Sequence, residues 1–206
     1  ICYTLKLADK AGDEKFIREW QDMPSRVKDS FIKVFWNENV NYLADYVNEE
    51  GQNLYVRPNQ IIACSLEYSP LSDEMKRDVL DVVKGMLLTP RGLRTLSPRN
   101  SLYKGQYEGN QMERDQAYHQ GTVWAWLIGP YIEANFRLYG KSFAKEAKNL
   151  LAGFEDDMTV YGVCSVNEIY DGNPPYTPNG CISQAWSVGE ILRSMAMIKK
   201  YVKNSQ

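Results

Sequence analysis

The chain has 206 residues, of which 44% are hydrophobic and 24% charged, and its formal net charge is −2. These values are typical of one globular domain, so we expect residues 1–206 to form a single domain. No basic block is present to bind nucleic acid, and no apolar run reaches the ~18 residues of a membrane span. No signal peptide is visible. The chain begins with Ile1 rather than Met, and we expect a portion of a longer protein.

Apolar residues at three- and four-residue spacing predict helices along most of the chain. The predicted helices cover residues 13–35, 58–66, 72–88, 121–139, 141–154 and 183–202. Pro24 either kinks the first of these helices or starts a second one. Ser72 is a predicted N-cap, Pro130 predicts a kink, and Gly140 is a predicted C-terminal stop.

Two long connections, residues 89–120 and 161–182, separate these helices, and no strand pattern is evident. Both are rich in Gly, Pro, Asn and Tyr. Connections of this length in a compact domain are usually functional. We therefore expect an all-α fold of antiparallel helical hairpins, with both connections on one rim.

The four cysteines and the single histidine limit the metal chemistry of the chain. Cys2, Cys64, Cys164 and Cys181 form no Cys-x-x-Cys pair, and His119 stands alone, so we expect no metal site. A disulfide between the third and fourth cysteines is one arrangement, and free thiols in a reducing compartment are the favoured one. No glycine-rich phosphate loop or Ser-His-Asp order is present, and no cofactor is predicted.

Glu168 is the strongest candidate for a catalytic group. The segment after it, residues 173–180, contains three prolines and cannot be helical, so the carboxylate lies on a loop. Tyr170, Tyr176 and Trp186 lie near it in the sequence. Catalytic groups are often placed on loops of a rigid scaffold, and a carboxylate among aromatic rings is typical of a sugar site. The alternative is a turn glutamate that points into solvent.

The first connection ends in residues 114–126, which concentrate Asp, Tyr, His, Gln and Trp. Sugar hydroxyls need paired donors and acceptors, and sugar C–H faces need aromatic planes. A lone histidine is more often structural than catalytic, so a structural role is the alternative to sugar binding for His119. Trp124 and Trp126 cannot face the same way on a helix, so we expect at least one in the core. A further polar cluster, residues 57–60, either binds ligand or caps the helix that follows.

Together these segments resemble the C-terminal part of the amylo-α-1,6-glucosidase domain of glycogen debranching enzymes. The matching segments are Arg57-Pro58-Asn59-Gln60, Tyr118-His119-Gln120-Gly121-Thr122-Val123-Trp124, Asn167-Glu168-Ile169-Tyr170-Asp171-Gly172 and Gln184-Ala185-Trp186-Ser187-Val188. Their order and spacing agree from about Phe31 onward. Ala125 departs from the family, which often has proline there.

The resemblance implies about half of an (α/α)6 toroid whose loops form a sugar pocket. It also implies inverting hydrolysis of α-1,6-linked glucose at glycogen branch points, with Glu168 as the general base. The implied partner is glycogen or another branched α-glucan, and the implied location is the cytoplasm. The predicted substrate-binding residues are Arg57, Asn59, Gln60, Asp115, Tyr118, His119, Gln120, Trp124, Asp171 and Trp186.

The resemblance also predicts what this chain lacks. The family's general acid is an aspartate in an earlier segment of the toroid, so we expect the isolated chain to lack it. A half toroid leaves helix faces uncovered, which predicts self-association. The alternatives are a non-catalytic glucan-binding helical module, a related toroidal α-glucosidase acting on another glucan, and a helical scaffold for protein contacts.

Overall fold

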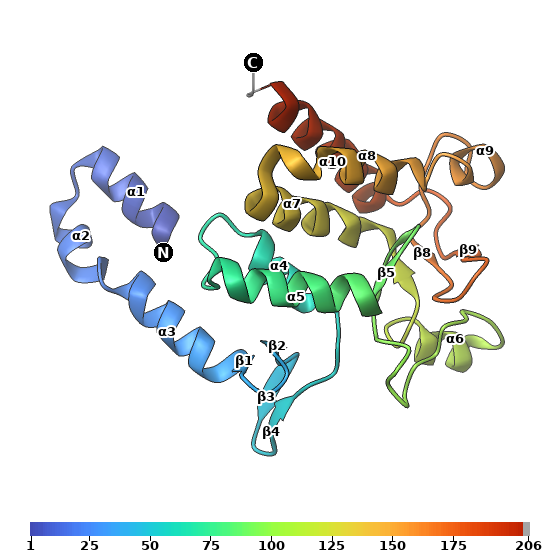
Figure 1. The fold of residues 1–206 in the computed structure, drawn as a ribbon, viewed down its shortest axis with the longest axis horizontal. Helices are drawn as coiled ribbons and strands as arrows, with labels where there is room; N and C mark the ends of the chain where they lie inside the picture. The colour runs from blue at the N-terminus through green and yellow to red at the C-terminus, as the bar shows by residue number, and fades with distance from the viewer. Residues whose placement is uncertain (204–206) are drawn as a thin grey trace.

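The computed structural model describes residues 1–203 and consists mainly of helices, with a short-stranded sheet at one end (Figure 1). The helices are α1 Cys2–Ala11, α2 Glu14–Trp20, α3 Met23–Phe35, α4 Asn59–Ser65, α5 Asp73–Met86, α6 Gln111–Ala117, α7 Ile128–Tyr139, α8 Ala144–Ala152, α9 Asp157–Val160 and α10 Ala185–Lys203, with 3-10 turns η1 Ala125–Leu127 and η2 Gly140–Phe143. The strands are β1 Trp36–Asn37, β2 Tyr42–Leu43, β3 Tyr46–Asn48, β4 Gly51–Asn53, β5 Leu88–Thr89, β6 Gly92–Arg94, β7 Val123–Trp124, β8 Ile169–Tyr170 and β9 Pro178–Asn179.

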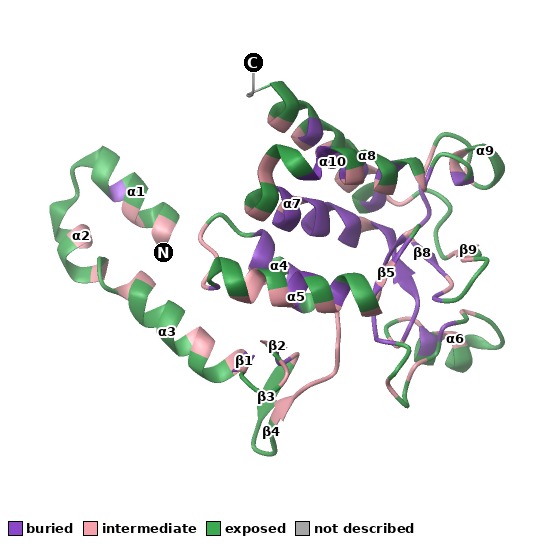
Figure 2. Cartoon of the chain, viewed as in Figure 1, coloured by how far each residue is buried: buried purple, intermediate pink, exposed green. Residues whose placement is uncertain are grey.

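Helix α7 lies at the centre of the core, because α4, α5 and α10 all pack against it. Most of its residues from Ile128 to Phe136 are buried. Figure 2 shows the buried residues concentrated in α7 and in the sheet beside it. A helix that is apolar on nearly every side is buried by neighbours on several sides. The helical majority expected from the sequence is therefore confirmed, with α7 as its centre.

Helices α1, α2 and α3 form an arm that extends away from this core (Figure 1). Within residues 1–35, Ala8 is the only buried residue. The arm returns to the body at its first helix, where the Tyr3 hydroxyl donates to Glu67 Oε2 at 2.8 Å. The Tyr3 ring also meets Tyr68 edge-on, with 5.0 Å between ring centroids. The apolar stripe of the arm is thus left largely uncovered.

The predicted helix over residues 13–35 is two helices, α2 and α3. Pro24 lies in the first turn of α3, where its missing N–H leaves no intrahelical bond unmade. The Ser72 N-cap is confirmed, since its side chain accepts from the Met75 backbone N–H at 3.2 Å. Helix α5 ends at Met86 rather than at Leu88, because Leu88 begins strand β5.

The expectation that the chain has no strands is wrong. Five short strands form one antiparallel sheet in the order β5-β6-β7-β8-β9, and two hairpins, β1-β2 and β3-β4, precede it. In the sheet, Leu93 pairs with Trp124, and Val123 pairs with Tyr170. Strands of two or three residues are too short to show a period-2 pattern in the sequence.

The predicted helix over residues 121–139 is also corrected by this sheet. Val123 and Trp124 form β7, so the α-helix starts only at Ile128. Pro130 therefore lies in the first turn of α7 and produces no interior kink. Gly140 ends α7 with a φ of 55°, as its position predicts.

The sheet joins the two long connections. Strands β5 and β6 belong to the first connection, β8 and β9 belong to the second, and β7 lies between them. Beyond the strands, the Gly172 N–H donates to the Gly105 carbonyl at 2.6 Å. The expectation that both connections lie on one rim is confirmed, and main-chain pairing is what holds them there.

All four cysteines are free thiols, so the disulfide alternative for Cys164 and Cys181 is excluded and both lie exposed. Burial raises the pKa of the Cys64 thiol to about 12, which keeps this core residue protonated. Among residues 1–203, no helix combines the length and apolar character needed to cross a bilayer.

Candidate active site

Glu168 immediately precedes β8 and is held by hydrogen bonds from two directions. Its backbone N–H donates to the Cys181 carbonyl at 2.9 Å. In return, the Cys181 N–H donates to Glu168 Oε2 at 3.0 Å. The Tyr118 hydroxyl donates to the other carboxylate oxygen, Oε1. The carboxylate is half-buried and each of its oxygens has a donor. The alternative of a turn glutamate pointing freely into solvent is not what the structure shows.

Gly180 leaves the space that the carboxylate occupies. Its φ is 69°, a left-handed conformation that side chains with a Cβ rarely adopt. A Cβ at this position would lie 2.6 Å from Glu168 Oε2. Both the turn after β9 and the orientation of Glu168 therefore require glycine here.

Aromatic rings surround the Tyr118 side of this carboxylate. Tyr118 meets Trp124 edge-on at 4.9 Å between ring centroids. His119 stacks on Trp124, at 5.1 Å and an interplanar angle of 14°. Trp186, at the start of α10, meets Trp124 at 5.6 Å and is 47% exposed. An exposed indole beside a stacked His–Trp pair offers the planes that sugar C–H faces need.

Trp124 and Trp126 occupy different environments, as expected. Trp124 is buried, and its indole N–H donates to the Tyr118 carbonyl at 3.0 Å. Trp126 is half-buried and stacks on Trp186 at 5.8 Å. Both rings nevertheless reach Trp186, because this stretch is a strand followed by a 3-10 turn rather than a regular helix.

Arg57 joins the segment before α4 to the Tyr118 segment. Its guanidinium donates to the His119 carbonyl at 2.7 Å, to the Thr95 carbonyl at 3.1 Å and to Gln120 Oε1 at 2.6 Å. It also forms an ion pair with Asp45 at 3.5 Å. Arginine suits this role because its planar fork directs several donors at once. The capping alternative for residues 57–60 therefore does not account for Arg57.

Asn59 and Gln60 point to different surroundings. The Asn59 amide donates to Asp45 Oδ1 at 2.6 Å, beside Arg57. Gln60 is buried and donates to the Arg57 carbonyl at 3.2 Å. The side-chain oxygen of Gln60 is buried and has no hydrogen-bond partner among the described residues. Asn59 thus opens toward the Arg57 group, whereas Gln60 lies in the interior beneath it.

The two aspartates predicted to bind substrate lie in different places. Asp171 Oδ1 accepts from the Tyr107 N–H at 2.9 Å and from the Asn179 amide at 3.0 Å, which ties the two connections together. Asp115 is exposed on α6 and accepts from Gln111 at 2.6 Å. This hydrogen bond lies within α6 itself, so the structure does not bring Asp115 into the group around Glu168.

A cavity of about 490 Å³ adjoins the Arg57 group. Its lining residues are Asp45, Tyr46, Tyr55, Arg57, Pro58, Asn59, Thr95, His119 and Gln120. Four of them, Arg57, Asn59, His119 and Gln120, are predicted from the sequence to bind substrate. The sequence analysis does not find Asp45, Tyr46 and Tyr55, because they lie in or beside the short hairpins β1–β4, which show no strong sequence pattern.

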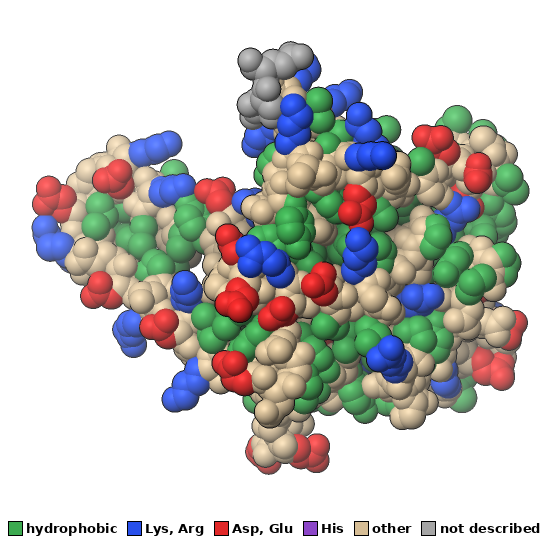
Figure 3. Space-filling model, viewed as in Figure 1, with side chains coloured by type: hydrophobic (Ala, Val, Ile, Leu, Met, Phe, Trp, Pro, Cys, Tyr) green, Lys and Arg blue, Asp and Glu red, His purple; other side chains and the backbone are tan. Residues whose placement is uncertain are grey.

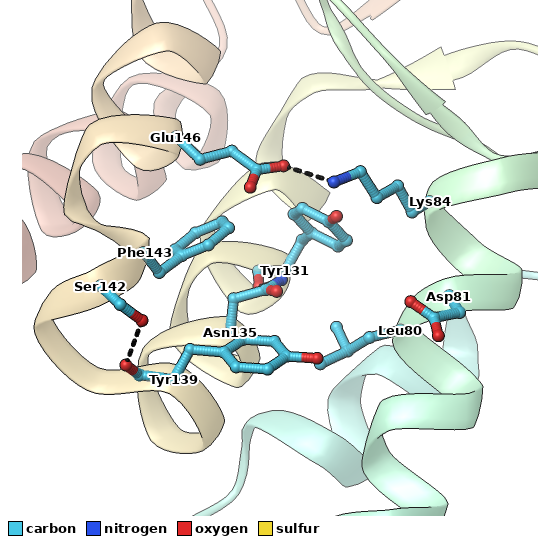
Figure 4. A pocket seen from close by; sticks show the side chains of 9 residues that line it. All are labelled: Leu80, Asp81, Lys84, Tyr131, Asn135, Tyr139, Ser142, Phe143 and Glu146. Atoms are coloured by element: carbon cyan, nitrogen blue, oxygen red, sulfur yellow. Dashed lines mark hydrogen bonds and ion pairs between the residues drawn. The ribbon is translucent and has the colours of Figure 1, made fainter.

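A second cavity, of about 250 Å³, lies elsewhere, between α5, α7 and α8 (Figure 4). The Lys84 ammonium donates to Glu146 at 2.8 Å across it, and Asn135 and Tyr131 lie inside it. None of the predicted site residues line this second cavity. Within residues 1–203, His, Cys, Asp and Glu side chains form no group of three or more that could hold a metal ion.

Comparisons with known proteins identify the family and the fold of the chain. The family described as Amylo-alpha-1,6-glucosidase matches residues 3–193. A curated relative, "Glycogen debranching enzyme" of Saccharomyces cerevisiae, is 27% identical over 150 residues, which is 60% of this chain. The chain spans only about a tenth of that relative's length.

A solved structure, "Neutral trehalase Nth1 from Saccharomyces cerevisiae", is similar over 90% of this chain and 32% of its own, with a TM-score of 0.63 and 15% identity. This likeness shows a shared fold. The match over residues 3–193 covers nearly the whole chain and contains every residue placed around Glu168. The chain therefore belongs to the amylo-alpha-1,6-glucosidase family, a family of glycoside-hydrolase domains.

Proposed function

We propose that this chain supplies the general base and part of the sugar pocket of an inverting α-1,6-glucosidase that acts at branch points of glycogen or a similar α-glucan. The observation that carries the proposal is the Glu168 carboxylate, held by Tyr118 and Cys181 beside exposed aromatic rings in a member of this family. The yeast relative is named as a glycogen debranching enzyme, which supports a branched glucan as substrate.

In this proposal Glu168 accepts a proton from a water molecule as that water attacks the anomeric carbon. An inverting enzyme places its second carboxyl about 6.5–9.5 Å from the base, so that the water fits between them. The second carboxyl protonates the glycosidic oxygen, which leaves with the glucan chain as a hydroxyl when its bond to the anomeric carbon breaks. Hydroxyls of the glucose bind the polar groups around Arg57 and Asn59, and its C–H face packs on Trp186.

We assign the general acid to a segment beyond these residues. Asp45 forms an ion pair with Arg57 and accepts a hydrogen bond from Asn59. Asp171 accepts two hydrogen bonds through Oδ1. Neither is placed as a proton donor, so the isolated chain is expected to bind glucan without hydrolysing it.

We further propose that residues 1–206 form one domain that is part of an (α/α)6 toroid. The uncovered stripe of the arm supports this, since a toroid would cover it with further helices. In the isolated chain those further helices are absent, so the same stripe favours self-association. A cytoplasmic location, where glycogen is stored, fits a protein whose exposed thiols are free.

The test is Glu168→Gln in the complete protein encoded by the gene, assayed by glucose release from an α-1,6-glucosyl dextrin. We expect kcat to fall about 10²- to 10⁴-fold, because the amide cannot accept the proton. Glucan affinity and melting temperature should change little. The control is Glu155→Gln, an exposed glutamate in the turn between α8 and α9, which should behave like the wild type.

The anomer of the released glucose tests the stereochemistry. Proton NMR during the first turnovers should show β-glucose, since inversion turns an α-linkage into a β-product. Near-normal turnover in Glu168→Gln would remove Glu168 as the base. Glucan binding by a complete protein that releases no glucose would favour the non-catalytic binding module instead.

A further inference from the structure

Tyr118 is predicted as a sugar-binding residue, but its hydroxyl is directed at another protein group. It donates to Glu168 Oε1 from 50 residues away in the sequence. No other hydrogen bond of this hydroxyl is present in the described part of the chain. Burial first, and then the hydrogen bond to Glu168, raise the pKa of Tyr118 above its ordinary value. The phenol therefore stays protonated and remains a donor at neutral pH.

The backbone of Tyr118 is fixed by hydrogen bonds at its carbonyl. Thr122 Oγ1 donates to this carbonyl at 2.6 Å and the Trp124 indole donates at 3.0 Å. Thr122 is fully buried and Trp124 nearly so. Thr122 is part of the core and Trp124 belongs to strand β7, so these two donors fix the position from which the Tyr118 side chain extends.

The ring of Tyr118 is packed on several sides. Tyr107 lies 5.7 Å away between ring centroids, His119 4.7 Å and Trp124 4.9 Å. Packed aromatic rings have few rotamers available, so the hydroxyl has little freedom to turn away from Glu168. A side chain meant to adapt to varied sugar hydroxyls would need more freedom than this.

We infer that Tyr118 is a positioning residue for Glu168, whose hydroxyl fixes Oε1 while the Cys181 N–H fixes Oε2. Each carboxylate oxygen has lone pairs beyond the one used by its donor. The two donors set the plane of the carboxylate and leave a lone pair free to accept the proton of the attacking water. The inference rests on the proposed function of Glu168 and adds the group that orients it.

The first test is Tyr118→Phe in the complete protein, which removes the hydroxyl and keeps the ring. We expect kcat on an α-1,6-glucosyl dextrin to fall about 10- to 100-fold, because a misplaced base acts less efficiently. KM and the glucan Kd should stay within about twofold. The matched control is Tyr107→Phe, which deletes the hydroxyl of the neighbouring ring, for which the described residues supply no hydrogen-bond partner. It should leave kcat unchanged.

The second test is a double-mutant cycle with Glu168→Gln. A residue that acts only through Glu168 has nothing to orient once the carboxylate is gone. Tyr118→Phe should therefore cause no further loss of kcat in the Glu168→Gln background. The cycle also remains informative if Tyr118→Phe lowers the melting temperature, since a structural defect would lower activity in both backgrounds.

Three results would overturn the inference while the proposed function stands. They are a normal kcat in Tyr118→Phe, a rise in KM and Kd at unchanged kcat, and multiplicative losses in the double variant. The second of these would show that the hydroxyl binds substrate. A wild-type protein that releases no glucose would overturn the proposed function, and the inference with it.

Discussion

His119 combines packing with a proposed role in sugar recognition. One face stacks on Trp124, while the residue as a whole remains exposed and lines the Arg57 cavity. We expect His119→Ala to weaken glucan binding about 3- to 10-fold, the equivalent of one hydrogen bond. The free energy of unfolding should change by less than about 1 kcal/mol. Calorimetric titration with a branched dextrin and a melting curve measure the two effects, and a large loss of melting temperature would show a structural role.

The protonation of His119 adds a pH dependence to this prediction. Partial burial of the ring, and then the Arg57 charge, lower the pKa of His119 below its ordinary value. The pKa of His119 is therefore lower in the folded protein than in the unfolded chain, where it is about 6.5. The contribution of neutral His119 to the free energy of unfolding is fully present above the unfolded pKa and is lost as the pH falls through the folded pKa. The free energy of unfolding, measured by chemical denaturation, should accordingly be constant from about pH 7 to 8 and decline at acidic pH.

At the scale of elements, the pairing of β7 with β8 places the Tyr118 segment beside Glu168, and β6 pairs with the other side of β7. Gly92 permits this pairing, since its φ is 127° and a Cβ there would lie 2.5 Å from the Trp124 carbonyl oxygen. We expect Gly92→Ala to destabilise the fold by about 2–3 kcal/mol, through strain and backbone displacement. Chemical denaturation measures the change, and an unaltered midpoint would contradict the role given to this sheet.

Gly85→Ala is the matched control for this element. Gly85 lies within α5 with nothing within 4 Å of its Cβ position and no positive φ. Alanine favours helix there, so this variant should be neutral or more stable, by at most about 1 kcal/mol. The stability changes expected for Gly92→Ala and Gly85→Ala have opposite signs. This difference separates a backbone requirement at the sheet from a general effect of adding a methyl group.

At the scale of the whole molecule, the arm determines how the isolated chain behaves in solution. Leu7 is 66% exposed and Val27 is 51% exposed, and hydrophobic side chains gather along the arm in Figure 3. A cavity of about 670 Å³ lies between the arm and the end of α4. We expect sedimentation velocity to show concentration-dependent self-association, weakened by Val27→Lys and unchanged by the polar control Lys33→Gln. A monomer at all concentrations would contradict the uncovered-face argument.

Much of the candidate site can be predicted from the sequence because its residues stand in recognisable segments. The prolines after Glu168 place it outside any helix, and the aromatic density of residues 114–126 predicts a sugar-binding surface. The contacts of Glu168 cannot be predicted in this way. Tyr118 is 50 residues away and Cys181 is 13 residues away, and two-residue strands bring them together without leaving a pattern.

The amino-acid sequence by itself determined most of the helices, the caps at Ser72 and Gly140 and the chemical character of the segments around Glu168, because these depend on neighbours within a few turns of the chain. Only the tertiary structure decided that Val123 and Trp124 form a strand, that Asp115 lies apart from the site and that Arg57 binds the His119 carbonyl. The physical reason is that these outcomes depend on main-chain hydrogen bonds between distant segments. Such bonds use groups that every residue carries, so the side chains give little indication of them.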